Sequence, residues 1–308
     1  MILLWGVMDD EPMAMTAAAL ARAGAEYVFL DHAKVFTSEI ECILAPQGVQ
    51  RCIVTADATT IDLSAVTVAY VRGAPWRDYE EMQGRSFDDP LALRAMGFEI
   101  KLKAWLDASD ALVINRSDAS ATNNSKPYQL AQIRQAGFAI PETFITNEPD
   151  AAREFLARNP ESIYKSVSGV RSIVRRVGEM QRASIDDVRW CPTLFQRVVP
   201  GTNYRAHVIG DEVFAVRIAS DQLDYRYGQT SMTAITLPRE IEQRCRELTE
   251  RLGLYFSGID LMLTPEGEWF CFEVNPSPGY PYFEMAGGQP IAAALAAFMV
   301  EADAERES

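Results

Sequence analysis

One segment, residues 258–275, constrains the fold most, because two carboxylates recur in it at positions that a β-hairpin would bring together. Apolar residues alternate with polar ones on both sides of a central turn, which predicts two antiparallel strands. In this hairpin Asp260 lies directly opposite Glu273, and Asn275 follows two residues later on the same face, because side chains alternate between the faces of a strand. The register predicts a four-residue loop at 265–268.

The polar face of this hairpin predicts a metal site. Two carboxylates that face each other repel unless a cation or a shared proton lies between them. Asp260, Glu273 and Asn275 offer only oxygen donors, which suit Mg²⁺, with Mn²⁺ as the alternative, rather than zinc or copper. A solvated strand face with two independent salt bridges is the competing interpretation, but the apolar flanks favour the metal site.

Residues 204–218 form a second predicted hairpin. A three-residue loop beginning at Gly210 places Arg205 directly opposite Arg217. Like charges in this position are unfavourable, and an anion between the two guanidinium groups would remove the conflict. Neutralisation of each arginine by an acidic residue from elsewhere is the alternative. The pattern favours an anion site.

A lysine in the predicted strand 162–167 also suits the binding of an anion such as phosphate. Alternation puts Lys165 on one face with Ile163 and Val167, where an ammonium is costly unless it meets a phosphate or another acceptor. Extension of the side chain to solvent is the equal alternative. Together these cations and the all-oxygen site indicate nucleoside triphosphate chemistry. The sequence lacks both GxxxxGK[ST] and a GxGxxG after its first strand, which excludes a P-loop and a dinucleotide fingerprint.

The order of apolar segments predicts three regions. Residues 1–115 alternate short strands with helices, which is typical of an α/β domain with a parallel sheet. A polar stretch at 117–125 marks a boundary, and residues 116–198 form a central region. Residues 199–308 read as antiparallel hairpins interrupted by a helix at 238–252, so the expected fold class is α/β followed by α+β.

Composition narrows the range of binding partners that the chain can have. The chain has 43 acidic and 29 basic residues, a net charge of −14 and a pI of about 4.7, which argues against nucleic acid and anionic membranes as partners. No apolar run reaches the roughly 18 residues of a membrane-spanning helix. Five scattered cysteines without a CxxC pair predict buried thiols in a reducing cytoplasm, and the presence of only two histidines excludes a histidine-rich metal site.

These residues, in this order, resemble the ATP-grasp family, and within it the ribosomal-protein-S6 glutamate ligase (RimK) type and the related maturases of ribosomal peptides called graspetides. The resemblance covers about residues 113–284. It rests most specifically on Gly-Ile-Asp at 258–260 and Phe-Glu-Val-Asn-Pro-Ser-Pro-Gly at 272–279. Val-Ile-Asn and Ser-Lys within 113–126 and the segment 195–205 are further signals. The implied fold is an ATP-grasp fold with an N-terminal Rossmann-like α/β domain, a central lid and a C-terminal antiparallel-sheet domain.

The resemblance implies a role for each site residue. Asp260, Glu273 and Asn275 would hold magnesium ions that bridge the ATP phosphates. Arg205 and Arg217 would act in catalysis by stabilising the transferring phosphoryl group and the acyl phosphate. The backbone of the 196–199 segment would contact the adenine edge, and the lysines would contact the phosphates. The implied nucleotide-binding set is Lys126, Lys165, Ser168, Gly169, Gln196, Val198, Val199 and Asn203.

Two departures from the family pattern affect these roles. Relatives often carry a Gly-rich loop after the second lysine, whereas residues 166–174 contain one glycine, which leaves Ser168 and Gly169 among the candidates for covering the phosphates. Relatives often have aspartate where this chain has Asn203.

The implied activity is ATP-dependent carboxylate–amine ligation through an acyl phosphate, with release of ADP and phosphate. The carboxylate belongs to a small molecule or a peptide, and the acceptor is an amino acid, a small metabolite or a peptide. A macrocyclase that forms ester or amide cross-links in ribosomal peptides and a non-catalytic nucleotide-binding protein are the alternatives. Homodimers are common among such ligases, and the sequence leaves a homodimer open.

Overall fold

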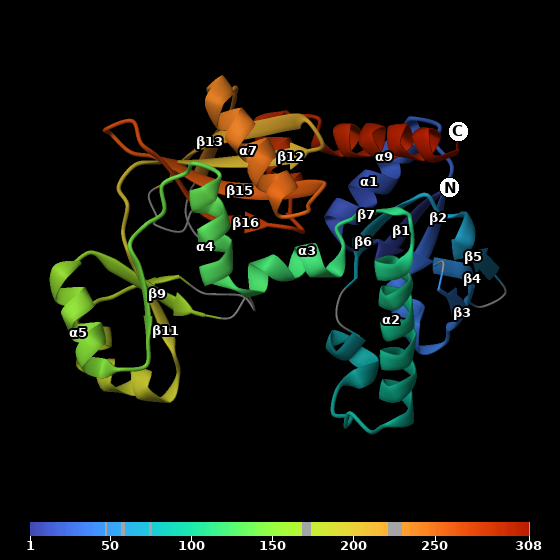
Figure 1. The fold of residues 1–308 in the computed structure, drawn as a ribbon, viewed down its shortest axis with the longest axis horizontal. Coiled ribbons are helices and arrows are strands. Elements are labelled where there is room, and N and C mark those ends of the chain that lie inside the picture. The colour runs from blue at the N-terminus through green and yellow to red at the C-terminus, as the bar shows by residue number, and fades with distance from the viewer. Residues whose placement is uncertain (47, 57–58, 74–75, 168–173, 221–229, 308) are drawn as a thin grey trace.

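The described strands form four sheets, and the three-stranded sheet is inserted in sequence between strands of the N-terminal one (Figure 1). The computed structural model describes residues 1–46, 48–56, 59–73, 76–167, 174–220 and 230–307. The expected combination of a parallel α/β region with a C-terminal antiparallel sheet is confirmed. Within the described ranges, a bent pair of C-terminal helices passes a length and hydropathy test for a membrane span only when taken together, and no single helix passes it.

The N-terminal region is a parallel sheet of strand order β2-β1-β6-β7. Alternate residues of the central strand enter two different cores, Leu4 on one face and Leu3 on the other, because helices cover both faces. The first helix begins after Asp10, whose carboxylate accepts a hydrogen bond from the Met13 amide. The elements are β1 (Ile2–Gly6), α1 (Glu11–Arg22), β2 (Tyr27–Asp31), η1 (His32–Phe36), η2 (Leu63–Ala65), β6 (Val68–Arg72), η3 (Trp76–Asp78), η4 (Glu80–Met82), α2 (Pro90–Ala108) and β7 (Leu112–Ile114).

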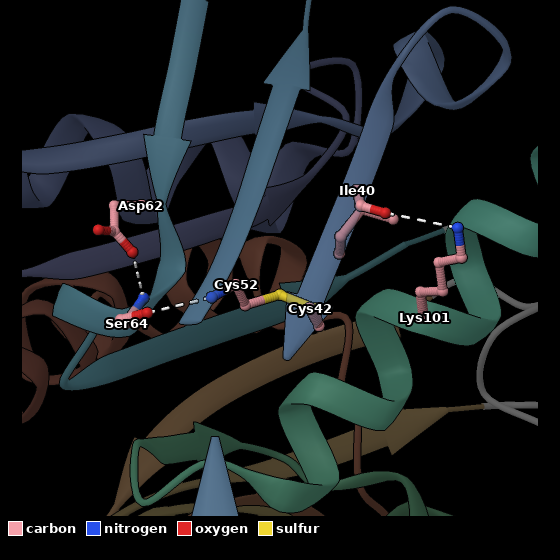
Figure 2. Close-up of a disulfide and its surroundings, with 6 residues drawn as sticks. All are labelled: Ile40, Cys42, Cys52, Asp62, Ser64 and Lys101. Atoms are coloured by element: carbon pink, nitrogen blue, oxygen red, sulfur yellow. Dashed lines mark hydrogen bonds between the residues drawn. A yellow bond between two sulfur atoms is a disulfide. The ribbon is translucent and has the colours of Figure 1, made fainter. Parts of the chain in front are cut away.

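A small antiparallel sheet, β3 (Glu39–Ala45), β4 (Gly48–Ala56) and β5 (Thr59–Asp62), is inserted in this region. Cys42 and Cys52 lie directly opposite each other in β3 and β4 and form a disulfide (Figure 2). Their side chains meet only because the hairpin register aligns them, and the sequence spacing of 10 residues carries no such signal.

The prediction that all five cysteines are buried thiols is therefore wrong. Cys42 and Cys52 are bonded to each other, and Cys191 is exposed. Cys245 and Cys271 are buried thiols as expected, and burial raises the pKa of Cys245 to about 12. The cysteine pattern thus no longer supports a reducing compartment.

Within the predicted central lid (116–198), residues 143–197 contain an antiparallel sheet of order β10-β9-β11-β8 with its own small core. The rings of Phe144 and Phe155 stack with their centroids 5.5 Å apart at the centre of this core. Two helical turns and α4 lead into the lid from the N-terminal region (Figure 1). The elements are α3 (Ser117–Ala121), η5 (Thr122–Asn124), α4 (Lys126–Gln135), β8 (Thr143–Thr146), α5 (Pro149–Arg158), β9 (Ser162–Ser166), β10 (Arg175–Arg176), α6 (Glu179–Ala183), η6 (Ile185–Trp190) and β11 (Thr193–Arg197).

The C-terminal sheet has the strand order β14-β13-β12-β15-β16. Helix α7 buries Ile241, Cys245, Leu248 and Leu252 against one face, which confirms the predicted apolar stripe. Helix α9 returns to pack on α1 and the parallel sheet, so both termini lie at the same end of the molecule (Figure 1). The elements are β12 (Thr202–Ile209), β13 (Glu212–Ser220), β14 (Thr230–Ile235), α7 (Arg239–Arg251), β15 (Phe256–Leu263), β16 (Trp269–Asn275), α8 (Pro281–Gly287) and α9 (Ile291–Glu307).

The predicted register of the first hairpin of this sheet is wrong by one residue. Ile209 pairs with Glu212 around a two-residue turn, not with Val213 around a three-residue loop. Arg205 consequently lies opposite Val216, and Arg217 projects from the other face of the sheet. The apolar pattern misled because both faces of this hairpin are buried, one in the core with α9 and the other in the core with α7.

The predicted pairing of Asp260 with Glu273 is confirmed, although the predicted loop of the second hairpin is wrong. Leu263 pairs with Trp269 rather than with Phe270. A β-bulge next to Asp260 absorbs the difference, because it inserts one extra residue into β16 before Glu273.

Candidate active site

Three charged side chains lie in one row across the C-terminal sheet. Arg205 on β12 pairs with Asp260 on β15, and Asp260 pairs with Glu273 on β16, so all three project from the same face. Arg205 Nη1 donates a hydrogen bond of 2.9 Å to Asp260 Oδ1. The side chains of Arg205 and Asp260 are 6% and 30% exposed, so the row runs from a buried cation to partly exposed carboxylates.

A second row of residues lies on the same face, two residues further along each strand. Gly258 pairs with His207 on one side and with Asn275 on the other. The Oδ1 atom of Asn275 accepts a 2.9 Å hydrogen bond from the amide of Ser277. Burial holds the pKa of His207 well below its usual range, and the Arg205 cation lowers it further. A neutral His207 can accept from Arg205, whose Nε lies 3.5 Å from His207 Nε2.

The opposite wall of the site comes from the lid and the start of α4. Lys126, the first residue of α4, and Lys165 on β9 line one narrow pocket together with Gln196, Phe272 and Glu273. The two lysines are 7% and 9% exposed, and ammonium groups are rarely buried this far unless acceptors surround them. The pocket of about 10 Å³ is no larger than one water molecule, so the predicted nucleotide would fit there only if its two walls separated.

Gln129 fixes the strand that carries Glu273. Its side-chain Nε2 donates to the Val274 carbonyl at 2.8 Å, and its Oε1 accepts from the Val274 amide at 3.0 Å. The amide of Gln129 thereby takes the place of a neighbouring strand on the open edge of β16. This holds Glu273, the preceding residue, beside α4.

Asn115, which follows β7, ties the N-terminal region to the same sheet. Its Nδ2 donates to the carbonyls of Phe256 and Pro276 at 2.7 and 2.6 Å, and its Oδ1 accepts from the Tyr255 amide at 2.8 Å. The segment that follows the predicted metal ligand Asn275 is thus anchored on the N-terminal region.

Arg72, at the carboxyl end of β6, makes a second link between these regions. It forms an ion pair with Asp10, with Nε 2.5 Å from Oδ2, and donates from Nη1 to the Ser277 hydroxyl at 2.8 Å and to the Pro278 carbonyl at 3.2 Å. Burial alone would lower the pKa of Arg72, but the hydrogen bonds with Asp10 and the interactions with Asp10 and Tyr70 together outweigh it and raise that pKa. Arg72 is therefore a permanently charged link.

The predicted adenine-binding segment lies at the end of β11. Gln196 lines the lysine pocket and donates from Nε2 to Thr143 Oγ1 at 2.9 Å. The Val198 amide donates to the Glu161 carbonyl at 2.9 Å. Val199 is buried against the C-terminal sheet. The contact of this segment with adenine stays a prediction.

Two other predicted residues of the described ranges, Asn203 and Arg217, do not line this pocket. Asn203 is half-buried on the Arg205 face, two residues before Arg205. Arg217 is exposed on the opposite face, so its predicted role now rests on the family resemblance alone. Ser168 and Gly169 lie outside the described residues.

The donor set on the sheet fits a hard cation that shares its ligands with a substrate. Among the described residues no group of three His, Cys, Asp or Glu side chains could hold a metal ion by itself. Asp260, Glu273 and Asn275 supply two carboxylates and one amide from one face. Mg²⁺ is commonly held by one or two carboxylates and completed by phosphate oxygens of the substrate, which matches this set.

Sequence reasoning missed Gln129, Phe272 and the space that holds the Arg205 guanidinium group. Gln129 looks like an ordinary polar helix residue, and only the proximity of α4 to the edge of β16 gives it a partner. Phe272 reaches the pocket because the β-bulge changes the alternation of β16. The motif 258–260 pointed to this strand but not to the reason for its glycine.

Comparison with known proteins identifies the family. A model of the ATP-grasp domain matches residues 123–279. The chain is 26% identical over 210 residues to the probable alpha-L-glutamate ligase 1 of Hahella chejuensis, a match that covers 63% of this chain and 68% of that protein. It is 27% identical over 202 residues to the probable alpha-L-glutamate ligase of Alkalilimnicola ehrlichii, covering 60% of this chain and 66% of that protein. The matched regions thus span about two thirds of these relatives.

Solved structures match along almost the whole chain. The ATP-grasp ligase PsnB complexed with a minimal precursor superposes with a TM-score of 0.83 at 25% identity, covering 98% of both chains. The macrocyclase MdnC bound with the precursor peptide MdnA, from Microcystis aeruginosa, has a TM-score of 0.83 at 20% identity, covering 97% of this chain and 99% of that chain. The family model matches just over half of the sequence, and the chain therefore belongs to the ATP-grasp family of ADP-forming ligases.

Proposed function

We propose that this ligase joins a carboxylate to an amine through an acyl phosphate, with ATP as the phosphoryl donor and Mg²⁺ as the cation. The observation that carries the proposal is the apposition of two buried lysines with Glu273 in one pocket, next to the row of Arg205, Asp260 and Glu273. Cations from one wall and hard-cation ligands from the other are what a magnesium-bound polyphosphate requires.

Each group of residues has a task in this scheme. Lys126 and Lys165 bind and orient the phosphates, and they compensate negative charge in a site that excludes water. Asp260, Glu273 and Asn275 hold Mg²⁺, which when bound neutralises the phosphate oxygens and makes the terminal phosphorus more open to attack. Arg205 adds a fixed positive charge where charge develops as the phosphoryl group moves to the carboxylate.

The second step needs positioning rather than a protein nucleophile. An acyl phosphate is already activated, so an amine held next to its carbonyl carbon attacks it and expels phosphate. The atoms balance as one amide bond formed and one phosphate released, with the amine proton passing to solvent or to the leaving phosphate. Exclusion of water by the closed lid protects the acyl phosphate from hydrolysis.

A peptide is the better-supported carboxylate substrate. The ligase PsnB, solved with a minimal precursor, superposes on 98% of this chain with a TM-score of 0.83 at 25% identity. A RimK domain protein from Sphaerobacter thermophilus covers 97% of this chain with a lower TM-score of 0.59. The agreement over full length includes the N-terminal region, through which Arg72 and Asn115 contact the site. Cross-linking of side chains within one peptide is accordingly the second candidate function.

The test is trapping of the activated carboxylate. The protein is incubated with ATP, Mg²⁺ and hydroxylamine, and with either free glutamate or acidic peptides encoded near its gene. We expect ADP and a hydroxamate in equal amounts with an accepted substrate. Without hydroxylamine, loss of one water from an acidic peptide shows a cross-link, and addition of an amine shows ligation. Formation of AMP, or ADP without hydroxamate, would contradict the acyl phosphate.

A further inference from the structure

The guanidinium group of Arg205 lies in a space that exists only because residue 258 has no side chain. A Cβ atom at Gly258 would lie 2.0 Å from Nη2 and 2.5 Å from Cζ of Arg205, and 2.8 Å from Cβ of Pro278. Separations below 3.0 Å are not compatible with ordinary packing. The backbone of Gly258 is not left-handed, so conformation does not require a glycine there, and close approach is the reason for it.

The other sides of this space are also defined. Asp260 accepts from Nη1 of Arg205 at 2.9 Å, and His207 Nε2 lies 3.5 Å from its Nε. The ring of Phe283, on α8, lies with its centroid 5.5 Å from Cζ of Arg205, within cation–π range. A flexible side chain is thus confined by a carboxylate, an imidazole, an aromatic ring and the bare backbone of Gly258.

Confinement of this arginine matters because of what it contacts. Arg205 is 5% exposed, and a charge buried this far is stable only where its partners are fixed. Its carboxylate partner, Asp260, lies directly opposite Glu273. A shift of the guanidinium would therefore move one of the three predicted metal ligands together with the predicted phosphoryl-stabilising group.

We infer that Gly258 is a positioning residue, which sets the place of Arg205, and through it of Asp260, for phosphoryl transfer. The inference rests on the proposed function for the role of Arg205, and it adds that the absence of a side chain at position 258 is itself required. Gly258 contacts no substrate in this scheme and acts only through Arg205.

The test is a double-mutant cycle with Gly258→Ala and Arg205→Ala, each alone and combined. Misplacement of a catalytic group by about 1 Å costs on the order of 10²-fold in rate, so we expect G258A to lower kcat about 100-fold. In the R205A background the methyl group still meets Pro278 but no longer meets the guanidinium, and we expect G258A to lower kcat by less than about threefold. The KM for ATP should change less than kcat in G258A, because the lysine pocket is untouched.

Stability gives a second reading that does not depend on turnover. Overpacking by the new methyl group should lower the Tm of the G258A protein by about 5 °C, and this loss should be clearly smaller in R205A/G258A, where only the contact with Pro278 remains. Gly97→Ala is the control for an added methyl group, because a Cβ at Gly97 meets no atom within 4 Å. If G258A alone is too unstable to purify, recovery of folded R205A/G258A supports the same coupling.

The outcomes separate this inference from the proposed function. Equal effects of G258A in both backgrounds, on kcat and on Tm, would show that Gly258 acts independently of Arg205 and would overturn the inference. Absence of hydroxamate from the wild-type protein with its peptide would count against the proposed function, and the Tm cycle would still decide whether Gly258 seats Arg205. Failure of both G258A proteins to fold would also overturn the inference.

Discussion

The two hairpins of the C-terminal sheet carry their charges differently. In β15–β16 the two carboxylates lie opposite each other on one face, as the sequence pattern predicts. In β12–β13 the two arginines lie on opposite faces, one buried beside Asp260 and the other exposed. The β15–β16 hairpin has one polar and one apolar face near the site, whereas both faces of the β12–β13 hairpin are buried. Alternation fixes a register only where the two faces differ in polarity.

The largest expected effect comes from the hairpin whose Asp260–Glu273 pairing was predicted correctly. Glu273→Gln keeps the shape of the side chain and removes one of the two opposed carboxylates. We expect kcat to fall at least about 10³-fold, because a charged group that organises the transition state is lost. The measurement is ADP release with an accepted carboxylate, over a range of Mg²⁺ concentrations.

The matched control for that substitution is Glu268→Gln, in the exposed turn of the same hairpin. We expect E268Q to leave turnover within about twofold of the wild-type rate, since surface substitutions away from a site rarely matter. Near-normal turnover of E273Q, with normal dependence on Mg²⁺, would show that the carboxylate pair is a solvated strand face.

The two arginines of the other hairpin provide the next test. Arg205→Ala removes a buried charge and leaves Asp260 without its 2.9 Å partner, so we expect kcat to fall about 10²- to 10³-fold. Arg217→Ala changes an exposed residue on the opposite face, and the geometry favours an effect of less than about threefold. Both rates are measured in the same ADP-release assay.

Comparable losses in R205A and R217A would break this comparison. They would mean that Arg217 reaches the reacting groups by a route that the strand register does not suggest, in agreement with the role implied by the family resemblance. A loss confined to R205A would show that only the buried arginine of the pair serves the phosphoryl group.

The sequence predicted structure best where apolar and charged residues alternate clearly within one element. Helix α7 has apolar residues at regular spacing on an otherwise charged helix, and all four predicted contacts, from Ile241 to Leu252, are buried. The Asp260–Glu273 pairing survived an incorrect loop because the β-bulge compensated for it. The motif pattern also gave the ATP-grasp fold, since its glycine, carboxylates and asparagine occur in a fixed order.

The features that sequence could not supply depend on contacts between distant segments. The Cys42–Cys52 disulfide depends on a hairpin register, and Gln129 finds its partner 145 residues away in β16. The space that holds the Arg205 guanidinium forms only because Gly258, on a strand, and Phe283, on a helix, lie on two sides of it. Periodicity describes one element at a time and carries no information about which element will lie beside it.

His32 is a buried side chain whose ring nitrogens lack hydrogen bonds among the described residues, and it contrasts with the buried but charge-paired Arg205. His32, in the N-terminal region, has no hydrogen bond to either ring nitrogen among the described residues, and Glu99 Oε1 lies 3.8 Å from its Nε2. Burial lowers the pKa of His32 to about 4, and the nearby Lys103 adds to this effect. Unlike Arg205, this side chain is stable only while it is uncharged.

The pH dependence of stability follows from that difference. Since the folded pKa of His32 lies below its unfolded value, the unfolded chain binds more protons between pH 6.5 and about 4, and stability falls as pH decreases through this range. The loss approaches about 3 kcal/mol at the acid end. We expect urea unfolding of His32→Leu to show a shallower decline than wild type from pH 7 to 4.5. Parallel curves for the two proteins would contradict the assignment.

The smallest expected effect concerns how the Glu273 strand is held in place. Gln129→Ala removes both hydrogen bonds to the backbone of Val274 and leaves a buried amide and carbonyl without these partners. We expect a loss of about 2 kcal/mol in the free energy of unfolding, measured with urea, and a decrease of kcat by about tenfold because Glu273 is no longer fixed. Gln132→Ala, at a half-buried position on the same helix, is the control. Equal changes in the two variants would show that the β15–β16 hairpin holds its carboxylates without help from α4, and the difference between the two hairpins would then lie in their strands alone.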